Sequence, residues 1–138
     1  MDRKRVRKAL VTGFIVLLLC TTGALGVLRH SIQSGLDQRC AIAQRSHPRP
    51  GDDVAAMMAY VRSESHSLRE RNLTVWALGQ ARDERALPIL QSYYRGGECD
   101  HDRCLCQGEL YKAIKLCQNK APNPLFIRIP KPTSVELQ

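Results

Sequence analysis

LRERNLTVWALGQARDERALPILQSYY, residues 68–94, decides the fold, because it predicts two helices folded back on each other. In the first helix, Leu73, Trp76 and Ala77 follow the i, i+3, i+4 spacing of an amphipathic helix. Gly79 widens this stripe, and its lack of a side chain would let another helix approach closely. We therefore expect Leu73 and Ala77 in the core, with Trp76 buried between the two helices.

The second helix begins after a break at residues 82–83. Asp83 is a good N-cap, since its carboxylate can accept a hydrogen bond from a backbone N–H of the first turn. Pro88 lies near the start of this helix, where a missing N–H costs least. Leu87 and Leu90 share one face of the helix, which we expect to complete the core.

Residues 76–90, WALGQARDERALPIL, resemble a HEAT-like repeat of the short kind first described in phycobilin lyases. The resemblance extends over residues 52–118, and it implies an α-solenoid unit with a binding surface, without naming a partner. Residues 112–114 correspond to residues 76–78 one unit earlier, 36 positions before them, which is a longer offset than such short units need. The extra length lies in a cysteine-rich segment, residues 99–106, which a solenoid can accommodate between helices.

The composition limits the class of protein. With 138 residues, the chain has room for one small domain. A hydrophobic content of 43% with only 5% aromatic residues suits helices packed through Ala and Leu better than a β-sandwich. The net charge of +8 is concentrated near the N-terminus, where residues 3–8 contain five basic side chains, so we do not expect a nucleic-acid partner.

Residues 9–28, ALVTGFIVLLLCTTGALGVL, predict a single transmembrane helix. They carry no charge, and 20 helical residues span about 30 Å, the thickness of the hydrocarbon core. A cleaved signal peptide is the alternative, but the apolar run is longer than a usual signal-peptide core and no clear A-x-A site follows it. The basic flank, residues 1–8, predicts a cytoplasmic N-terminus. Residues 29–138 then face the outside, which in a bacterium is the periplasmic side of the inner membrane.

The rest of the chain divides at its prolines and glycines. Residues 29–51 are interpreted as a juxtamembrane linker. Residues 29–43 can continue as a helix, with Ile32, Leu36 and Ala43 roughly on one side, and two prolines and Gly51 then break it. Residues 52–119 form the predicted helical domain, and residues 120–138, with four prolines, form an extended tail. Within the domain, helices are expected at residues 52–65, 68–81, 84–95 and 104–118. The predicted fold is therefore all-α: a single N-terminal transmembrane helix followed by a short HEAT-like α-solenoid of about four helices.

Two interpretations compete for the cysteine-rich segment. Cys99, His101, Cys104 and Cys106 are four potential metal ligands within eight residues, but their spacing fits no standard zinc fold. Disulfide bonds are favoured over a metal, because the predicted topology places this segment in an oxidising compartment.

The directions of the helices indicate which cysteines pair. If the helices alternate up and down, Cys117 lies at the opposite end of the bundle from the cysteine-rich segment and close to Cys40. A helix over residues 104–118 would separate Cys106 from Cys117 by about 16 Å, too far for a disulfide. A helix that begins only at Gly108 would weaken this argument. We expect Cys40 to pair with Cys117, and Cys99 with Cys104 or Cys106, leaving one thiol free.

Known catalytic motifs are absent from the sequence, including a Gly-rich phosphate loop, H-E-x-x-H and G-x-S-x-G. The sequence therefore predicts a membrane-anchored, non-catalytic scaffold that faces the periplasm and binds a protein partner, with no cofactor and no catalytic residue. About two solenoid units are few, so a partner or a second copy of the chain would complete the core. The alternatives are a thiol-redox or metal-binding protein that uses the Cys99–Cys106 loop, and a bilin-lyase-like enzyme, which the resemblance implies.

Overall fold

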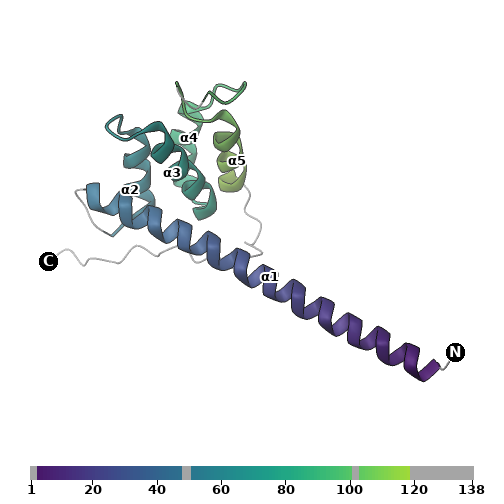
Figure 1. Ribbon diagram of the computed structural model, residues 1–138. Coiled ribbons are helices and arrows are strands. Elements are labelled where there is room, and N and C mark those ends of the chain that lie inside the picture. Colours follow the sequence, from purple (N-terminus) through teal and green to yellow (C-terminus); the bar gives the residue numbers. More distant parts are fainter. Residues whose placement is uncertain (1–2, 48–50, 101–102, 119–138) are drawn as a thin grey trace.

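The computed structural model describes residues 3–47, 51–100 and 103–118, and every regular element in these ranges is helical (Figure 1). No β-strand occurs among the described residues, so the predicted all-α class is confirmed. The predicted tail, residues 120–138, lies outside the described residues. In chain order, the elements are α1 (Arg3–Ser46), α2 (Asp53–Arg62), α3 (Leu68–Ala81), the 3-10 turn η1 (Glu84–Ala86), α4 (Leu87–Tyr93) and α5 (Gln107–Gln118).

α1 is one continuous helix of 44 residues, and its two halves have different surroundings (Figure 1). The C-terminal half packs against α2 and α3 and almost completely buries Leu36, Cys40 and Ala43. Residues 29–46 therefore continue as a helix, as expected over residues 29–43, but they pack into the core of the domain, where the sequence suggests a linker. The helix continues because the first proline of the chain comes only after its end, and because the i, i+4, i+7 spacing of these three residues provides a face for the core.

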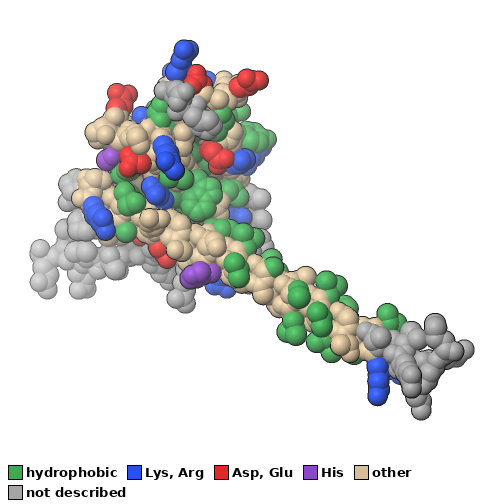
Figure 2. Space-filling view, in the orientation of Figure 1, with side chains coloured by type: hydrophobic (Ala, Val, Ile, Leu, Met, Phe, Trp, Pro, Cys, Tyr) green, Lys and Arg blue, Asp and Glu red, His purple; other side chains and the backbone are tan. Residues whose placement is uncertain are grey.

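The N-terminal half of α1 extends away from the domain and is apolar around its whole circumference. Its most apolar 18-residue window has a mean hydropathy of 2.2, and none of that window is buried. Figure 2 shows hydrophobic side chains along the visible side of this segment. By length and composition, this half of the helix can cross a membrane. Its large exposed side chains are Leu10, Val11, Phe14, Ile15, Val16, Leu17, Leu18, Leu19, Leu25, Val27 and Leu28.

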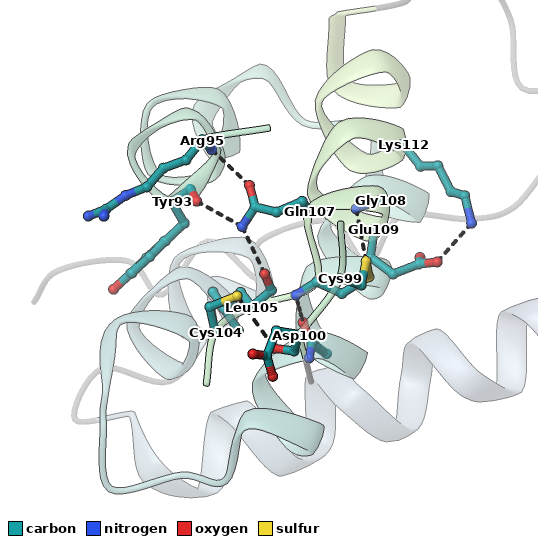
Figure 3. The surroundings of a disulfide bond; sticks show 12 residues. Tyr93, Arg95, Cys99, Asp100, Cys104, Leu105, Gln107, Gly108, Glu109 and Lys112 are labelled. Atoms are coloured by element: carbon teal, nitrogen blue, oxygen red, sulfur yellow. Dashed lines mark hydrogen bonds and ion pairs between the residues drawn. A yellow bond between two sulfur atoms is a disulfide. The ribbon is translucent and has the colours of Figure 1, made fainter. Parts of the chain in front are cut away.

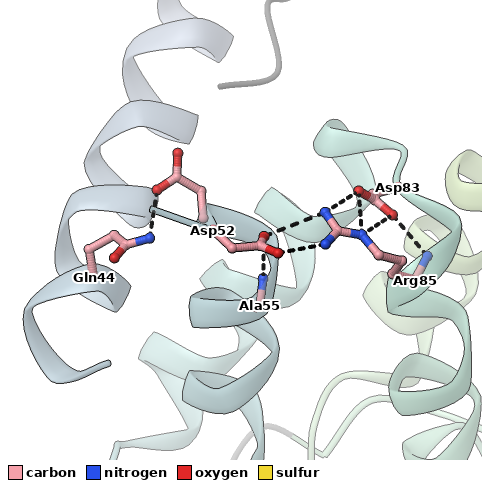
Figure 4. A network of polar contacts seen from close by, with 6 residues as sticks. Gln44, Asp52, Ala55, Asp83 and Arg85 are labelled. Carbon is pink, nitrogen blue, oxygen red and sulfur yellow. Dashed lines mark hydrogen bonds and ion pairs between the residues drawn. The ribbon is translucent and has the colours of Figure 1, made fainter. Parts of the chain in front are cut away.

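Carboxylates set the starts of two elements in the domain. Asp52 caps α2 by accepting a hydrogen bond from the Ala55 N–H at 3.0 Å. Asp83 caps η1 in the same way, accepting from the Arg85 N–H at 2.9 Å, as predicted. The guanidinium of Arg85 then joins the two caps, with ion pairs of 2.6 Å to Asp52 and 2.7 Å to Asp83 (Figure 4). One side chain thus fixes the start of α2 against the start of η1.

α3 lies at the centre of the domain, packed against α1, α2 and α5. Gly79 approaches Ala113 of α5 so closely that a Cβ atom at Gly79 would lie 2.8 Å from the Ala113 Cα. Gly79 therefore has the role that the sequence predicts for it, the close approach of another helix. Several side chains of the surrounding core are completely buried: Val75, Ala77, Leu78, Leu90 and Leu110.

Two residues of α3 lie outside their predicted places. Leu73 is 40% exposed, and Trp76 is only half-buried. The indole of Trp76 rests on Gly35 of α1, where a Cβ atom would meet it at 3.1 Å, rather than between the two repeat helices. The buried face of α3 includes Arg71 and Thr74. Because one of these residues is charged and the other polar, the spacing of hydrophobic residues in the sequence does not show which face of the helix is buried. The other expected core residues are Ala77 and Leu90, which are completely buried, and Leu87, which packs against the edge of the core.

Candidate functional site

A polar cleft of about 480 Å³ opens at the end of the domain where α3 begins and α4 ends. Four parts of the chain form it: the turn between α2 and α3, the first turn of α3, the end of α4, and the loop between α4 and α5. Its volume lies within the range of roughly 300–1,000 Å³ that is usual for ligand sites. We call it the arginine cleft, and it is lined by Glu64, Leu68, Arg71, Tyr93, Arg95, Gly96, Glu98, Arg103, Cys104, Leu105 and Gln107.

A cysteine pair closes the loop between α4 and α5. Cys99 and Cys106 lie at disulfide distance, with their Cα atoms 4.6 Å apart (Figure 3). The choice of Cys106 over Cys104 follows from the start of α5, because this helix begins only at Gln107 and leaves Cys106 in the loop. The backbone N–H of Cys106 also donates to the side-chain oxygen of Asn72 in α3, at 2.8 Å. The loop is therefore fixed to the central helix, through an asparagine whose sequence context carries no signal for this role.

Gln107 joins the same loop to the end of α4 (Figure 3). It is buried, and its Oε1 accepts the backbone N–H of Arg95 at 2.8 Å. Its Nε2 donates to the carbonyl of Leu105 at 2.9 Å and to the carbonyl of Tyr93 at 3.4 Å. Gln107 thus satisfies three backbone groups that helix and strand ladders leave unpaired. A glutamine at a helix start is ordinary in sequence, so this wall of the arginine cleft could not be predicted.

Arg71 is charged but buried, with only 7% of its surface exposed. Its Nε–H donates at 2.9 Å to the carbonyl of Val61, in the last turn of α2, where carbonyls lack helical partners. Its guanidinium carbon lies 5.6 Å from the centre of the Tyr93 ring, which is cation–π distance. Within the described residues, no carboxylate forms an ion pair with Arg71. A carbonyl and an aromatic ring therefore hold this cation in the wall of the cleft.

The predicted bond between Cys40 and Cys117 is wrong, because both residues are buried free thiols. Burial, together with Asp53 and Asp37, raises the pKa of Cys40 to about 12. The Cys117 thiol donates to the Leu78 carbonyl at 3.5 Å, and burial raises its pKa to about 11. The prediction assumed that Cys40 precedes the first helix of the domain. Cys40 is instead within α1, on its buried face, whereas Cys117 packs against α3.

The alternative metal site does not form in the described part of the chain. Cys99 and Cys106 are at bonding distance from each other, which removes two thiolates from the predicted ligand set. His101 lies outside the described residues. Cys104 is a free, half-exposed thiol that donates to the Asp100 carbonyl at 3.4 Å. Among the described residues, no group of three or more His, Cys, Asp or Glu side chains is placed to hold a metal ion.

Comparison with known proteins does not identify a family. No protein-family model, no curated protein and no solved structure matches this chain. The resemblance to HEAT-like repeats therefore stays a prediction, and function has to be argued from the two features that the structure defines, the apolar half of α1 and the arginine cleft.

Proposed function

We propose that the protein is a membrane-anchored, non-catalytic scaffold that holds a protein partner at the periplasmic surface of the inner membrane. The continuity of α1 carries this proposal, since one unbroken helix contains both the apolar segment and part of the domain core. Leu28 and Leu36 are eight residues apart, or about 12 Å of helix. A membrane around the apolar half would thus leave the domain directly above the headgroups, in a fixed orientation.

The flanking charges support the orientation. Residues 3–8 contain five Lys or Arg side chains, whereas residues 29–38 contain only Arg29. The flank that is richer in Lys and Arg stays in the cytoplasm during insertion. The domain would then fold outside the cytoplasm, where an oxidising environment maintains a disulfide such as Cys99–Cys106.

The helix packing supports a short HEAT-like arrangement as part of the proposal. α2 packs against α3, α4 against α5, and α3 against α5. Two stacked helical hairpins would make such contacts, with α3 and α5 in equivalent positions. The correspondence of residues 76–78 with residues 112–114 predicts the same equivalence. Stacked units of this kind bind partners through the surfaces and loops that their hairpins leave open.

A thiol-exchange protein is the second candidate, and Cys104 favours it. This thiol is unbonded, half-exposed and two residues before Cys106 in the same loop. A Cys104 thiolate would attack the Cys106 sulfur, form a Cys104–Cys106 bond and release Cys99 as a thiolate, with no net oxidation. We rank it second because the segment lacks the C-x-x-C spacing of thiol oxidoreductases.

Topology in a bacterial host tests the first proposal. The full chain should stay with membranes after carbonate washing, and alkaline phosphatase fused after Gln138 should be active. A green fluorescent protein fused at the same position should be dark, because it does not mature after export through the general secretory route. As a matched control, replacing the five basic residues of the N-terminal flank by Gln should lower phosphatase activity. Release by carbonate, or a fluorescent fusion with an inactive phosphatase, would reject the proposal.

A further inference from the structure

The arginine cleft contains a buried cation that the described chain does not neutralise. Arg71 is more than nine-tenths buried, yet its one hydrogen bond uses Nε–H and its acceptor is an uncharged carbonyl. Its two terminal nitrogens have no hydrogen-bond or ion-pair partner among the described residues, and Arg71 lines the cleft. Burying a charge is costly unless the charge is paired and hydrogen-bonded. Within the part of the chain that the structure describes, the site therefore lacks an anion.

The guanidinium is also held in place before any ligand arrives. The Val61 carbonyl fixes one edge of its plane, and the Tyr93 ring lies at cation–π distance. Little side-chain entropy would be lost on binding, because the rotamer is already selected. The unused terminal nitrogens can donate two parallel hydrogen bonds, a geometry that matches a carboxylate.

The charges around Arg71 select the kind of anion. Arg95 and Arg103 are exposed at the edge of the cleft, and so are Glu64 and Glu98. Arg103 also forms an ion pair of 3.7 Å with the nearby Asp100, so the remaining charges of the cleft are Arg71 and Arg95 against Glu64 and Glu98. A single carboxylate matches the two unused terminal nitrogens of Arg71 in this balance of charges, whereas a phosphate or a polyanion such as nucleic acid would meet repulsion from the two glutamates.

We propose that the arginine cleft binds the carboxylate of one Asp or Glu side chain presented by the protein partner. Arg71 donates one N–H from each of its two terminal nitrogens to it, and the exposed Arg95 attracts the acidic segment to the cleft. This inference rests on the proposed function, which supplies the protein partner, and it adds the chemistry by which that partner is recognised. The cysteine pair and Gln107 hold the loop that forms the opposite wall.

The test uses the full chain in zwitterionic micelles and the nuclear magnetic resonance signals of its arginine side chains. The probe is the blocked peptide acetyl-Gly-Glu-Gly-amide, and its neutral twin acetyl-Gly-Gln-Gly-amide is the control. The Glu peptide should shift the Arg71 Nε–Hε signal in a saturable way, and the Gln peptide should not. Equal shifts with the two peptides, or no shift with either, would reject the proposal.

Variants separate binding from folding. Arg71→Lys keeps the charge but loses the two-pronged donor, so its affinity for the Glu peptide should fall about tenfold. Arg71 also bonds the last turn of α2, so weaker binding by this variant could come from damage to the fold. A second variant, whose effect on binding cannot arise in that way, is therefore needed. Glu98→Gln removes an exposed negative charge from the edge of the cleft, and should tighten binding roughly two- to threefold at low salt. Unchanged or weaker binding by Glu98→Gln contradicts the proposed charge balance.

Two further probes identify the source of the anion. Inorganic phosphate should compete more weakly than the Glu peptide, and 20% phosphatidylglycerol in a nanodisc should leave the Arg71 signal unchanged. Tighter binding of phosphate, or a shift caused by the anionic lipid, would reject a protein carboxylate as the ligand. If the Glu peptide does not shift the Arg71 Nε–Hε signal in a chain that has the expected topology, only this inference is refuted. A wrong topology refutes the proposed function, whatever the cleft binds.

Discussion

The two halves of α1 belong to one helix, yet their apolar residues are arranged differently. Between residues 10 and 28, large apolar side chains point in all directions and stay exposed. Between residues 29 and 46, the buried side chains lie on one face, which packs on α2 and α3. A helix that is apolar all round needs an apolar environment, whereas a one-sided helix needs a protein neighbour. The arrangement of apolar residues around the axis, and not a break in the chain, therefore marks the end of the apolar segment.

The comparison has a mechanical consequence for the proposed scaffold. A flexible linker would let the domain search a volume above the membrane, whereas a continuous helix transmits its tilt and rotation directly to the domain. The arginine cleft would then point in a direction set by the packing of α1 on α2 and α3. A partner anchored in the same membrane could be selected by the height and direction of its acidic residue as well as by its charge.

The largest expected effect comes from shortening one leucine in each half of α1. Leu36→Ala should lower the free energy of unfolding by about 2–5 kcal/mol, because Leu36 is completely buried. Leu17→Ala should change it by less than about 0.5 kcal/mol, because Leu17 is 60% exposed in the apolar half of the helix. Chemical denaturation in micelles, followed by the fluorescence of Trp76 where it rests on Gly35, measures both. If the two variants change the free energy of unfolding equally, residues 29–46 do not pack into the domain core and act as a linker.

The next effect concerns the cysteine pair. Replacing Cys99 and Cys106 by Ser should cost about 2 kcal/mol of unfolding free energy, since the bond closes a short loop and constrains the unfolded chain only modestly. Cys104→Ser should cost almost nothing. In the native state a maleimide should modify Cys104, but it should not reach Cys40 or Cys117, which are buried. A Cys104→Ser variant as unstable as the double variant, or a labelled Cys117, would contradict the observed pairing.

Adding one methyl group to a packed and to an unpacked glycine sharpens the same contrast. Gly79→Ala should cost about 1–2 kcal/mol, because its Cβ would lie 2.8 Å from the Ala113 backbone and the gain in helix propensity only partly offsets the strain. Gly23→Ala should leave the domain's stability unchanged, as nothing lies within 4 Å of its Cβ. Thermal unfolding of the two variants in the same micelles is the measurement. A stabilising Gly79→Ala would mean that α3 and α5 can separate at no cost.

Local signals were the predictable part of this fold. Asp83 is an N-cap because its short carboxylate reaches a backbone N–H two residues later, and such a reach can be recognised in sequence. Gly79 likewise predicted a close contact between helices, which it makes with Ala113 of α5. The continuation of the helix over residues 29–43 was also predictable, but its packing on the domain was missed, because the prolines after it indicate the domain boundary in the sequence.

The candidate site was not predictable, because it depends on contacts between distant residues. Arg71 is buried, and it contacts a carbonyl of α2 and an aromatic ring of α4. The hydrophobic periodicity of the sequence instead assigns a charged residue such as this one to the surface. Asn72 and Gln107 act through backbone groups of the loop, which leave no trace in side-chain periodicity. The predicted Cys40–Cys117 pair failed for a related reason, since the rotation of α1 about its axis decides which element Cys40 faces.

The smallest expected effect lies in the ion pairs of Arg85, which link α2 to η1 outside the core. Hydrogen bonds from Arg85 hold the pKa of Asp83 below its usual range. Partial burial opposes the same shift at Asp52, but the Ala55 N–H and Arg85 outweigh it and lower the pKa of Asp52 as well. Because the folded state lowers both pKa values, the ion pairs stabilise the protein above about pH 4, and this contribution is lost as the pH falls through the folded values.

Arg85→Ala should therefore lower the free energy of unfolding by about 1 kcal/mol at pH 7, since the side chain is half-exposed and solvent screens its two ion pairs. The difference from the unmodified protein should stay constant between pH 7 and pH 5 and shrink towards zero near pH 2, as both carboxylates become protonated. Lys112→Ala is the matched control, because its ion pair with Glu109 lies within one helix and should contribute no more than about 0.5 kcal/mol. A pH-independent cost of Arg85→Ala would show that Arg85 stabilises the junction by packing its aliphatic chain and not by charge.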